Sequence, residues 1–444
     1  MSGDTTRAPG AASGSGVRSD GDGAGVVGGQ IHRGGGPPAA APDAGPRQAP
    51  DRRTVALRGQ ASSPSFDAAA LRGAEFPGLE GVAYLDSASV GPYPSRAREA
   101  HGRFEAVRAA PQNVTLDMQL GTLRRARALF ARTIGAGADE IVLAHNTSDG
   151  INLAARALPF RDGDVVVTSD GEFPANVYPW MALASRGVRL ELVPRRDDLP
   201  DEDALVAALD RPGVRALAIS WVSFSTGYRV DLARLGRECR ARGIWFVVDG
   251  IQGVGTMPLD VRACDVDILA SGAQKWLLSP WGTGFAYVRR ELVTELEPPA
   301  AGWLQVEGAE DFSRLTDYEL AWRDDARRFE VGTLPYQDFA AAVASMELML
   351  EVGIDAIAAH VATLVDRVVE WASARPRVNL VTPVDRDRRA AIVTIAMDDA
   401  RATSDRLREA GVIHSFREGA LRFSPHCFNT VEDVERALEV LERR

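Results

Sequence analysis

Short apolar runs alternate with helical stretches along most of this chain, and this alternation restricts the fold more than any other feature. Seven runs are predicted to be strands: EIVLAH (140–145), DVVVTS (164–169), VRLELV (188–193), VRALAIS (214–220), IWFVVD (244–249), DILA (267–270) and TGFAYV (283–288). Several are almost continuously apolar, as strands buried on both faces should be. Helical stretches lie between many of them, at 150–158, 201–209 and 232–242. The pattern predicts an α/β domain with a mostly parallel sheet of the seven-stranded type.

The two ends of the chain differ from this central part. Long helical patterns at 337–352 and 355–374 are followed by a strand at 390–397 and a closing helix at 431–442, which predicts a smaller α+β domain. The glycine-rich first 66 residues contain no aromatic side chain before Phe66. Such a segment cannot bury enough apolar surface to fold, so we predict a disordered tail. The predicted organisation is this tail (1–66), an N-terminal segment joining the small domain (67–110), a large domain (111–325) and a small C-terminal domain (326–444).

Composition excludes several classes of function. The net charge is −10, so the basic surface of a nucleic-acid-binding protein is not expected. No apolar run is as long as a membrane span, and no secretory signal opens the chain. The three cysteines, Cys239, Cys264 and Cys427, are too far apart for a disulfide framework or a CxxC metal site. We predict a cytoplasmic protein with no metal, no nucleic-acid partner and no membrane partner.

A single lysine, Lys275, stands among the 51 lysine and arginine residues. Arginine keeps its proton in proteins, whereas lysine can become a neutral amine that acts as a nucleophile or a base. The count alone leaves open a surface lysine that survived by chance. The surroundings favour a function, because Lys275 follows the apolar strand at 267–270 and precedes Trp276, Leu277 and Leu278. Burial there would lower its pKa, which is the condition for an amine that forms a Schiff base.

Two other strand ends carry polar residues of the kind that bind ligands. His145 to Gly150 open a helix, where hydroxyls and free N–H groups bind anions such as phosphate, although Asn-Thr-Ser is also ordinary capping chemistry. Asp249 ends a buried strand, where its carboxylate needs a cationic partner, and Gln252 follows three residues later. Ligands of open α/β sheets bind at such strand ends. With Lys275, these residues suit a phosphate, a basic ring nitrogen and an aldehyde, and pyridoxal 5′-phosphate (PLP) has all three.

Nucleotide cofactors are disfavoured by the same segments. The stretch DGIQGVG at 249–255 lacks the order GxGxxG, and its acidic residue precedes the glycines. No GxxxxGK[ST] loop occurs in the sequence, so the case for a P-loop NTPase is weaker than the case for a dinucleotide-binding protein. PLP therefore stays the predicted cofactor.

Six motifs in the same order resemble those of the class V aminotransferase family of fold type I PLP enzymes. They are NTSDGIN, EFPANVYPW, VDGIQGVG, SGAQKWLL, RFEVGT and LRFSPHCFNT, and with YLDSASVGP at residue 84 the resemblance covers about four fifths of the chain. The family includes cysteine desulfurases, selenocysteine lyases, kynureninase and isopenicillin N epimerase-like proteins. The resemblance implies a fold type I PLP-dependent transferase that works as a homodimer on a small-molecule amino acid.

The resemblance also implies roles for single residues. Lys275 would form the internal aldimine and Asp249 would pair with the pyridinium nitrogen, so these two are the predicted catalytic residues. The cofactor phosphate would be bound by Thr147, Ser148, the backbone of Asp149, Ser271 and Gln274. Gln252 would contact the phenolic oxygen, and Phe173 would lie on the ring face. Thr333 would reach the phosphate in the partner subunit. Arg422 would hold the substrate carboxylate. Asn176 is a candidate to line the substrate site, as are Ser223 and Ser225, and a turn or a cap is the alternative for each. Arg417 lies near Arg422 in sequence but cannot be aligned.

The type of reaction depends on groups that these motifs do not specify. Phe173 stands where desulfurases have a ring-stacking histidine, and phenylalanine cannot shuttle a proton. Residues 411–421 contain no cysteine where desulfurases have a nucleophilic thiol, and Cys427 lies beyond Arg422. We expect epimerase-, lyase- or aminotransferase-type chemistry at Cα or Cβ through Lys275, and no sulfur transfer through a persulfide. A true aminotransferase with a keto-acid acceptor and a non-catalytic amino-acid sensor are the alternatives.

Overall fold

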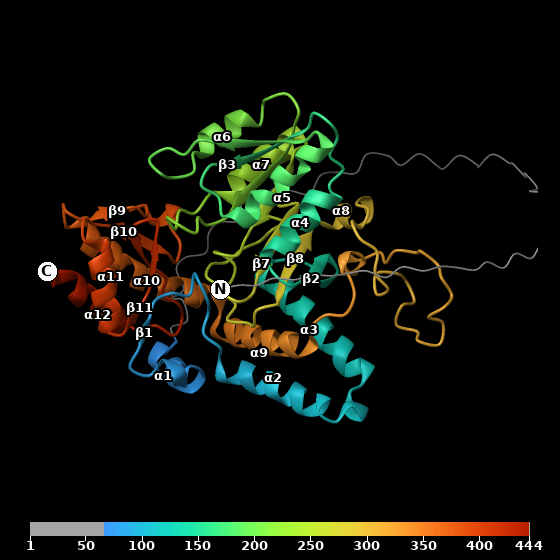
Figure 1. Ribbon diagram of the computed structural model, residues 1–444, viewed down its shortest axis with the longest axis horizontal. Coiled ribbons are helices and arrows are strands. Elements are labelled where there is room, and N and C mark those ends of the chain that lie inside the picture. The colour runs from blue at the N-terminus through green and yellow to red at the C-terminus, as the bar shows by residue number, and fades with distance from the viewer. Residues whose placement is uncertain (1–65, 444) are drawn as a thin grey trace, which may run out of the picture. The chain divides into compact units, whose positions relative to one another are not determined.

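The seven predicted strands form one sheet in the computed structural model, which describes residues 66–443 (Figure 1). They are β2 (Ile141–Ala144), β3 (Val165–Ser169), β4 (Arg189–Val193), β5 (Val214–Ser220), β6 (Trp245–Asp249), β7 (Ile268–Gly272) and β8 (Gly284–Val288). Their order is β2-β8-β7-β6-β5-β3-β4. Neighbours from β4 to β7 are parallel, and β8 is antiparallel to β2 and β7. The predicted α/β fold with a mostly parallel sheet is confirmed.

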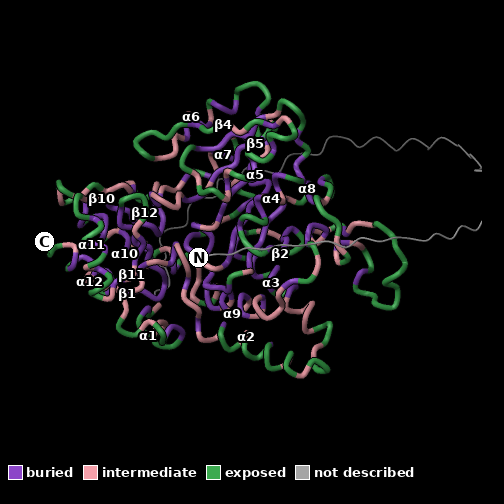
Figure 2. The backbone as a smooth tube through the Cα atoms, in the orientation of Figure 1, coloured by how far each residue is buried: buried purple, intermediate pink, exposed green. Residues whose placement is uncertain are grey.

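Helices cover both faces of this sheet. Val165 and Val167 pack into one apolar core and Val166 into another, as the alternation of side chains along a strand requires. The first core includes α3 (Leu116–Ile134), α6 (Glu202–Ala208) and α7 (Leu232–Arg242), and the second includes α4 (Thr147–Ala157), α5 (Tyr178–Met181) and α8 (Arg290–Glu295). Figure 2 shows the buried backbone running through the sheet and the helices next to it. Continuous apolar strands fold in this way because both of their faces are covered.

The C-terminal part contains a second, antiparallel sheet. Helices α9 (Tyr336–Val352) and α10 (Ile354–Ser373) precede it, and α11 (Ala400–Glu409) and α12 (Val431–Glu442) lie among and after its strands in the sequence. The strands are β9 (Asn379–Leu380), β10 (Val393–Ala396), β12 (Ser415–Arg417) and β13 (Ala420–Phe423), in the order β12-β13-β10-β9. The predicted helices at 337–352, 355–374 and 431–442 are found here, as is the predicted strand at 390–397.

The segment that follows residue 66 is joined to this C-terminal part. After α1 (Ala68–Glu75), strand β1 (Ala83–Tyr84) pairs in parallel with β11 (Val412–Ile413). Helix α2 (Ser95–Arg108) then packs against α9, and the rings of Phe104 and Tyr336 stack with centroids 6.3 Å apart. The four-part division of the chain stays a prediction, and residues 1–65 of its tail lie outside the described residues.

Residues 66–443 contain no single helix that is long and apolar enough to cross a membrane. Helices α9 and α10 together have that length and composition, but they are bent by 77° at the break between them. No group of three or more His, Cys, Asp or Glu side chains in the same range could hold a metal ion.

Candidate active site

Three strand ends bring the predicted residues to one edge of the large sheet. Asp249 ends β6 and is the register partner, one strand away, of Ala270 in β7. Lys275 follows three residues after the end of β7. Thr147 opens α4 shortly after β2, and its Oγ1 accepts a hydrogen bond from Gly272 N at 2.8 Å. The helix start, the carboxylate and the amine therefore belong to one site.

The turn that carries Lys275 is fixed by its backbone. A Cβ on Gly91 would lie 2.0 Å from Lys275 O, so only glycine allows this close approach. The N–H of Gly91 donates to Gln274 O at 2.8 Å, and the N–H of Leu278 donates to Lys275 O at 3.2 Å. Leu278 has a φ of 53°, a left-handed conformation that is uncommon for residues with a side chain. Strain of this kind is concentrated at functional sites.

Lys275 has the properties of a reactive amine. It is half-buried, and its Nζ lies 5.7 Å from the centroid of the Phe173 ring. Burial lowers the pKa of Lys275 to about 8, and the charges of Arg422 and Arg417 lower it too, whereas Asp249 opposes the shift. About a tenth of the amine is therefore neutral at pH 7, far more than for an ordinary lysine, and the neutral form is the one that attacks an aldehyde.

Asp249 is a buried carboxylate with no cationic hydrogen-bond partner among residues 66–443. It is 2% exposed, and its Oδ1 accepts one hydrogen bond, from Ile251 N at 3.0 Å. Burial raises the pKa of Asp249, and the charge of Glu172 raises it as well, whereas Lys275 lowers it. A ligand with a protonated ring nitrogen would supply the missing partner.

Glu172, to which the sequence assigned no role, lies next to Asp249. Its carboxylate accepts hydrogen bonds from Ser220 N and Asn176 Nδ2, both at 3.0 Å, and Ser220 is the register partner of Asp249 on β5. The Oδ1 of fully buried Asn176 accepts from Trp180 Nε1 at 3.2 Å. Both ends of the Asn176 amide are thus bound to protein groups, and one of these bonds holds the Glu172 carboxylate. The contact of Asn176 with substrate stays a prediction.

Gln252 has an amide whose orientation is determined by its partners. Its Oε1 accepts from Trp276 Nε1 at 2.7 Å, and its Nε2 donates to Ala88 O at 3.1 Å. An indole N–H can only donate and a carbonyl can only accept, so oxygen and nitrogen of this amide cannot be exchanged. The second N–H of Gln252 has no such partner in the described part of the chain and can donate to a ligand.

The start of α4 differs in one respect from the prediction. Asn146 is the N-cap, and its Oδ1 accepts from Asp149 N at 3.0 Å, so the backbone of Asp149 is not free for a phosphate. The Asp149 carboxylate lies 3.1 Å from His145 Nδ1. The N–H groups of Thr147 and Ser148 belong to the first turn, which has no acceptors within the helix. These two residues are what the helix start offers to an anion.

Ser271 and Gln274 lie beside Gly272, which bonds to Thr147. Ser271 is buried, and its Oγ donates to Gly272 O at 3.0 Å. A Cβ on Gly272 would lie 2.4 Å from Gln274 Oε1, so the Gln274 side chain packs directly on the glycine. Both predicted phosphate contacts are therefore near the start of α4, and their role stays a prediction.

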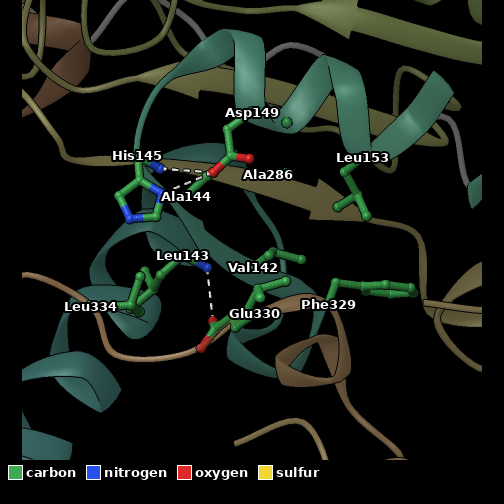
Figure 3. Close-up of a pocket in the computed structure, with 12 residues that line it drawn as sticks. Val142, Leu143, Ala144, His145, Asp149, Leu153, Ala286, Phe329, Glu330 and Leu334 are labelled. Atoms are coloured by element: carbon green, nitrogen blue, oxygen red, sulfur yellow. Dashed lines mark hydrogen bonds and ion pairs between the residues drawn. The ribbon is translucent and has the colours of Figure 1, made fainter. Parts of the chain in front are cut away.

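A cavity of about 100 Å³ adjoins the start of α4 (Figure 3). Residues of β2 and α4 line one side, and residues of the segment 329–334 line the other. Glu330 anchors this segment, because its carboxylate accepts from Leu143 N at 2.8 Å and from Arg127 Nε at 3.0 Å. Thr333, predicted to reach the partner subunit's phosphate, is exposed on the same segment.

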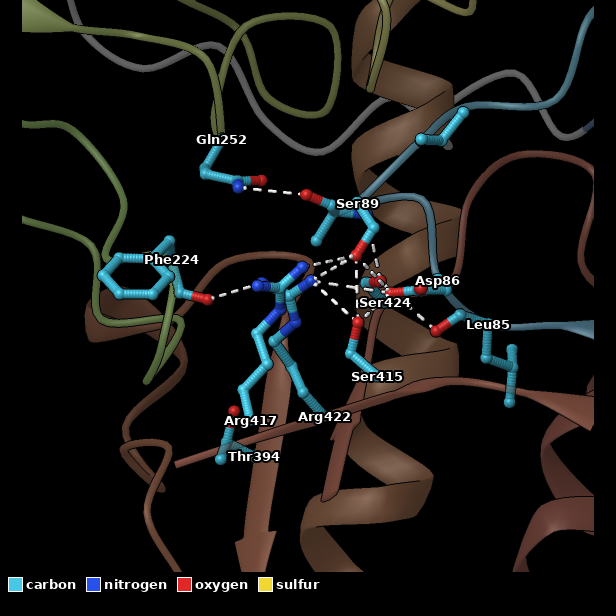
Figure 4. A network of polar contacts seen from close by, with 12 residues as sticks. Leu85, Asp86, Ser89, Phe224, Gln252, Thr394, Ser415, Arg417, Arg422 and Ser424 are labelled. Atoms are coloured by element: carbon cyan, nitrogen blue, oxygen red, sulfur yellow. Dashed lines mark hydrogen bonds and ion pairs between the residues drawn. The ribbon is translucent and has the colours of Figure 1, made fainter. Parts of the chain in front are cut away.

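Two arginines form a second wall of the site (Figure 4). Arg422 of β13 is 2% exposed, and it donates from Nη1 to Phe224 O and from Nη2 to Ser89 Oγ, both at 2.8 Å. Arg417 of β12 donates to the same Ser89 Oγ at 3.2 Å. Asp86 lies 3.5 Å from Arg422. The antiparallel pairing of β12 with β13 thus places Arg417, which the sequence could not align, beside Arg422.

Arg422 retains unused binding capacity. Its Nε is buried and has no hydrogen-bond partner within residues 66–443. Burial lowers the pKa of Arg422 to about 10. A buried guanidinium with an unpaired donor is stabilised when an anion binds, and a carboxylate offers matching geometry. The arginine pair can hold a carboxylate near Lys275.

These groups fit PLP. The N–H groups at the start of α4 match its phosphate, and the Asp249 carboxylate matches its ring nitrogen. The amine of Lys275, with its lowered pKa, matches the aldehyde, and the second N–H of Gln252 matches the phenolic oxygen. Phe173 is 40% exposed, and its ring meets that of Phe224 edge-on, with centroids 5.2 Å apart. An aromatic face is therefore available to the cofactor ring.

Known proteins with similar sequences and structures agree with this fit. A probable cysteine desulfurase of Methanothermobacter thermautotrophicus is 33% identical over 64% of this chain and 71% of its own length. The isopenicillin N epimerase of Streptomyces clavuligerus is 30% identical over 81% of this chain and 94% of its own. The apo structure of a cysteine desulfurase from Thermococcus onnurineus superimposes with a TM-score of 0.76 at 26% identity, covering 84% of this chain and 96% of its own.

These relatives correct one prediction. Several are named cysteine desulfurases, and so is the Thermococcus structure, which points to sulfur transfer through a persulfide. The exclusion of that chemistry from the sequence was therefore wrong. It assumed that the thiol must lie on the loop at 411–421 of the same chain, whereas a persulfide can also form on a thiol that arrives from outside.

The family itself is shown by a match along most of the chain. The family model described as Aminotransferase class-V matches residues 83–437, which include all three strand ends and both arginines. Enzymes of this family use PLP on small-molecule amino acids, and the site has the groups to bind both. The chain belongs to the class V aminotransferase family of PLP-dependent enzymes.

Proposed function

We propose that this enzyme removes the sulfur of a cysteine-type amino acid and passes it to a thiol that the chain does not supply. The observation that carries the proposal is the position of Lys275, whose amine lies near Asp249 and the arginine pair on a chain related to cysteine desulfurases. The relatives support the sulfur chemistry, and the site supports an amino-acid substrate.

The proposed roles follow from charge and position. PLP, when bound, supplies an electron-poor ring that stabilises negative charge at the substrate Cα. Arg422 and Arg417 hold the substrate carboxylate, which brings Cα within reach of Lys275. The neutral amine of Lys275 takes the Cα proton and later returns one to the product. Asp249 pairs with the protonated ring nitrogen and keeps it charged.

The three cysteines of the chain are poor sulfur acceptors. Cys427 is fully buried, and burial raises its pKa to about 12, so little of the nucleophilic thiolate forms. Burial raises the pKa of Cys264 to about 11, and Cys239 is buried in α7 with a raised pKa. We therefore propose an external acceptor. Its thiolate attacks the substrate sulfur, the C–S bond breaks, and the electron pair stays on Cβ, which is protonated. Cysteine and the thiol become alanine and a persulfide.

Replacing Cys239, Cys264 and Cys427 together by alanine or serine should leave kcat within a few fold. Each change costs about 1 kcal/mol of packing, so activity is compared per folded protein. Alanine formation from L-cysteine should rise with the concentration of added dithiothreitol in both proteins. Mass spectrometry of alanine and measurement of released sulfide test this.

Two results would contradict the external acceptor. One is a folded, PLP-loaded triple variant without activity, and the other is a persulfide on Cys427 in the wild-type protein after incubation with cysteine. Products from a panel of amino acids, with and without a keto acid, test the sulfur chemistry itself. A D-amino acid or a new amino acid in place of alanine would contradict it.

We further propose that the active unit is a cytoplasmic homodimer in which Thr333 reaches the partner's phosphate. Support comes from the exposure of Thr333 on the segment beside α4 and from its neighbour Val331, which is 54% exposed. An exposed apolar side chain next to a cofactor site is suited to cover by a second subunit.

A further inference from the structure

We propose that Trp276 is a positioning residue that fixes the amide of Gln252, so that one Gln252 N–H faces the phenolic oxygen of PLP. The inference rests on the binding of PLP in the proposed function. It does not depend on the sulfur chemistry or on the identity of the substrate.

The bond between Trp276 and Gln252 is buried and specific. Trp276 is 1% and Gln252 3% exposed, and the indole Nε1 donates to Gln252 Oε1 at 2.7 Å. Ala88 O accepts from Gln252 Nε2 at 3.1 Å. A donor that cannot accept and an acceptor that cannot donate thus hold the two ends of the amide. Only one orientation of the Gln252 amide makes both hydrogen bonds, and in it the second N–H of Nε2 is free to bind a ligand.

Trp276 is itself held in place by His426. The Nδ1 of His426 accepts from Cys427 N at 2.6 Å, so the proton of the neutral ring is on Nε2, which donates to Trp276 O at 2.9 Å. Burial lowers the pKa of His426 to about 4, which keeps the ring neutral in the physiological range. The ring centroids of His426 and Trp276 are 5.5 Å apart. The series His426, Trp276, Gln252 leads from the C-terminal part of the chain to the cofactor site.

Loss of the indole N–H would release the amide. Gln252 Oε1 would then be a buried acceptor without a donor, which is unfavourable, and the amide would turn toward another donor. A turned amide no longer presents its N–H to the phenolic oxygen. The phenolic oxygen and the lysine nitrogen share a proton when the cofactor is linked to Lys275. The oxygen bears the most negative charge once this proton is lost, so a hydrogen-bond donor to the oxygen favours the deprotonated form of the cofactor.

The test is a pH titration of the visible absorption of substrate-free holoenzyme. Trp276→Phe should raise the midpoint by about one pH unit, since one hydrogen bond to the deprotonated form is lost. It should also weaken PLP binding to the cofactor-free protein by roughly fivefold. Gln252→Ala should give the same shift, and the double variant should shift no further, because both changes remove one interaction.

Trp221→Phe is the matched control. Trp221 is buried and its ring packs on Gly253 of the same turn, but it does not donate to Gln252. Its replacement should leave the midpoint unchanged. The proposal is overturned if Trp276→Phe leaves the midpoint in place, if Gln252→Ala does so, or if the two shifts add in the double variant.

A second measurement applies if Trp276→Phe does not fold. In protein labelled with ¹⁵N-tryptophan, Gln252→Ala should move one indole N–H resonance upfield, because the hydrogen bond of Trp276 is lost. An unchanged set of indole resonances would show that Gln252 is not the acceptor, and the proposal would fail.

Discussion

Lys275→Arg should lower the rate of amino-acid turnover by at least about 10³-fold while leaving the fold intact. Arginine keeps a positive charge and a similar length, so packing in the turn between Gly91 and Leu278 is retained. A guanidinium does not lose its proton and cannot act as the amine that binds the aldehyde or moves the Cα proton. The visible absorption of the lysine-linked cofactor should disappear together with the activity.

The chain itself provides the control for this prediction. It has no second lysine, so no neighbouring side-chain amine can take over the function. Circular dichroism and the melting temperature report whether the variant is folded. A folded Lys275→Arg protein that keeps more than a few per cent of the wild-type rate would rule out Lys275 as the reacting amine.

Asp249→Ala should retain PLP but lose about 10²- to 10³-fold in kcat. The helix start and Lys275 still hold the phosphate and the aldehyde, so the cofactor stays bound. Without the carboxylate the ring nitrogen is no longer kept protonated, and the ring stabilises negative charge at Cα less well. Cofactor content and kcat are measured on the same preparation.

Asp267→Ala is a matched control for this change. Asp267 is also a buried carboxylate at a strand of the large sheet, but its Oδ1 lies 2.7 Å from Arg289 Nε. Its loss should lower stability, because the buried N–H of Phe246 loses its carboxylate acceptor and Arg289 keeps only Glu291 within residues 66–443. The kcat per folded protein should stay near the wild-type value. An Asp249→Ala variant with bound PLP and a near-normal kcat would contradict the proposed role of Asp249.

The strands of the large sheet could be predicted because they are buried on both faces. A strand such as β3 or β6 is apolar along its length, and this run is visible without any tertiary information. Helices α2 and α3 were not predicted, because α2 buries only Ala97 and Phe104 and α3 carries several arginines among its apolar residues. Which side of each helix is buried is decided by packing against α9, which is far away in the sequence.

Site residues could be predicted where a reactive side chain directly follows an apolar strand in the sequence. Lys275 and Asp249 each stand out by their position after an apolar run. Asp86 and Ser89 did not, because they follow β1 and meet Arg422 across more than 300 residues of sequence. Such contacts depend on the pairing of β1 with β11 and of β12 with β13, which no local pattern encodes.

Reduction of the holoenzyme with borohydride is the most direct test of Lys275 as the PLP-binding residue. Borohydride converts the link between the amine and the cofactor into a stable secondary amine, and peptide mass mapping then locates it. We predict a single pyridoxyl label on the peptide that contains Lys275, with no competing lysine in the chain. A label on the N-terminal amine alone, or no label on a yellow protein, would contradict the assignment.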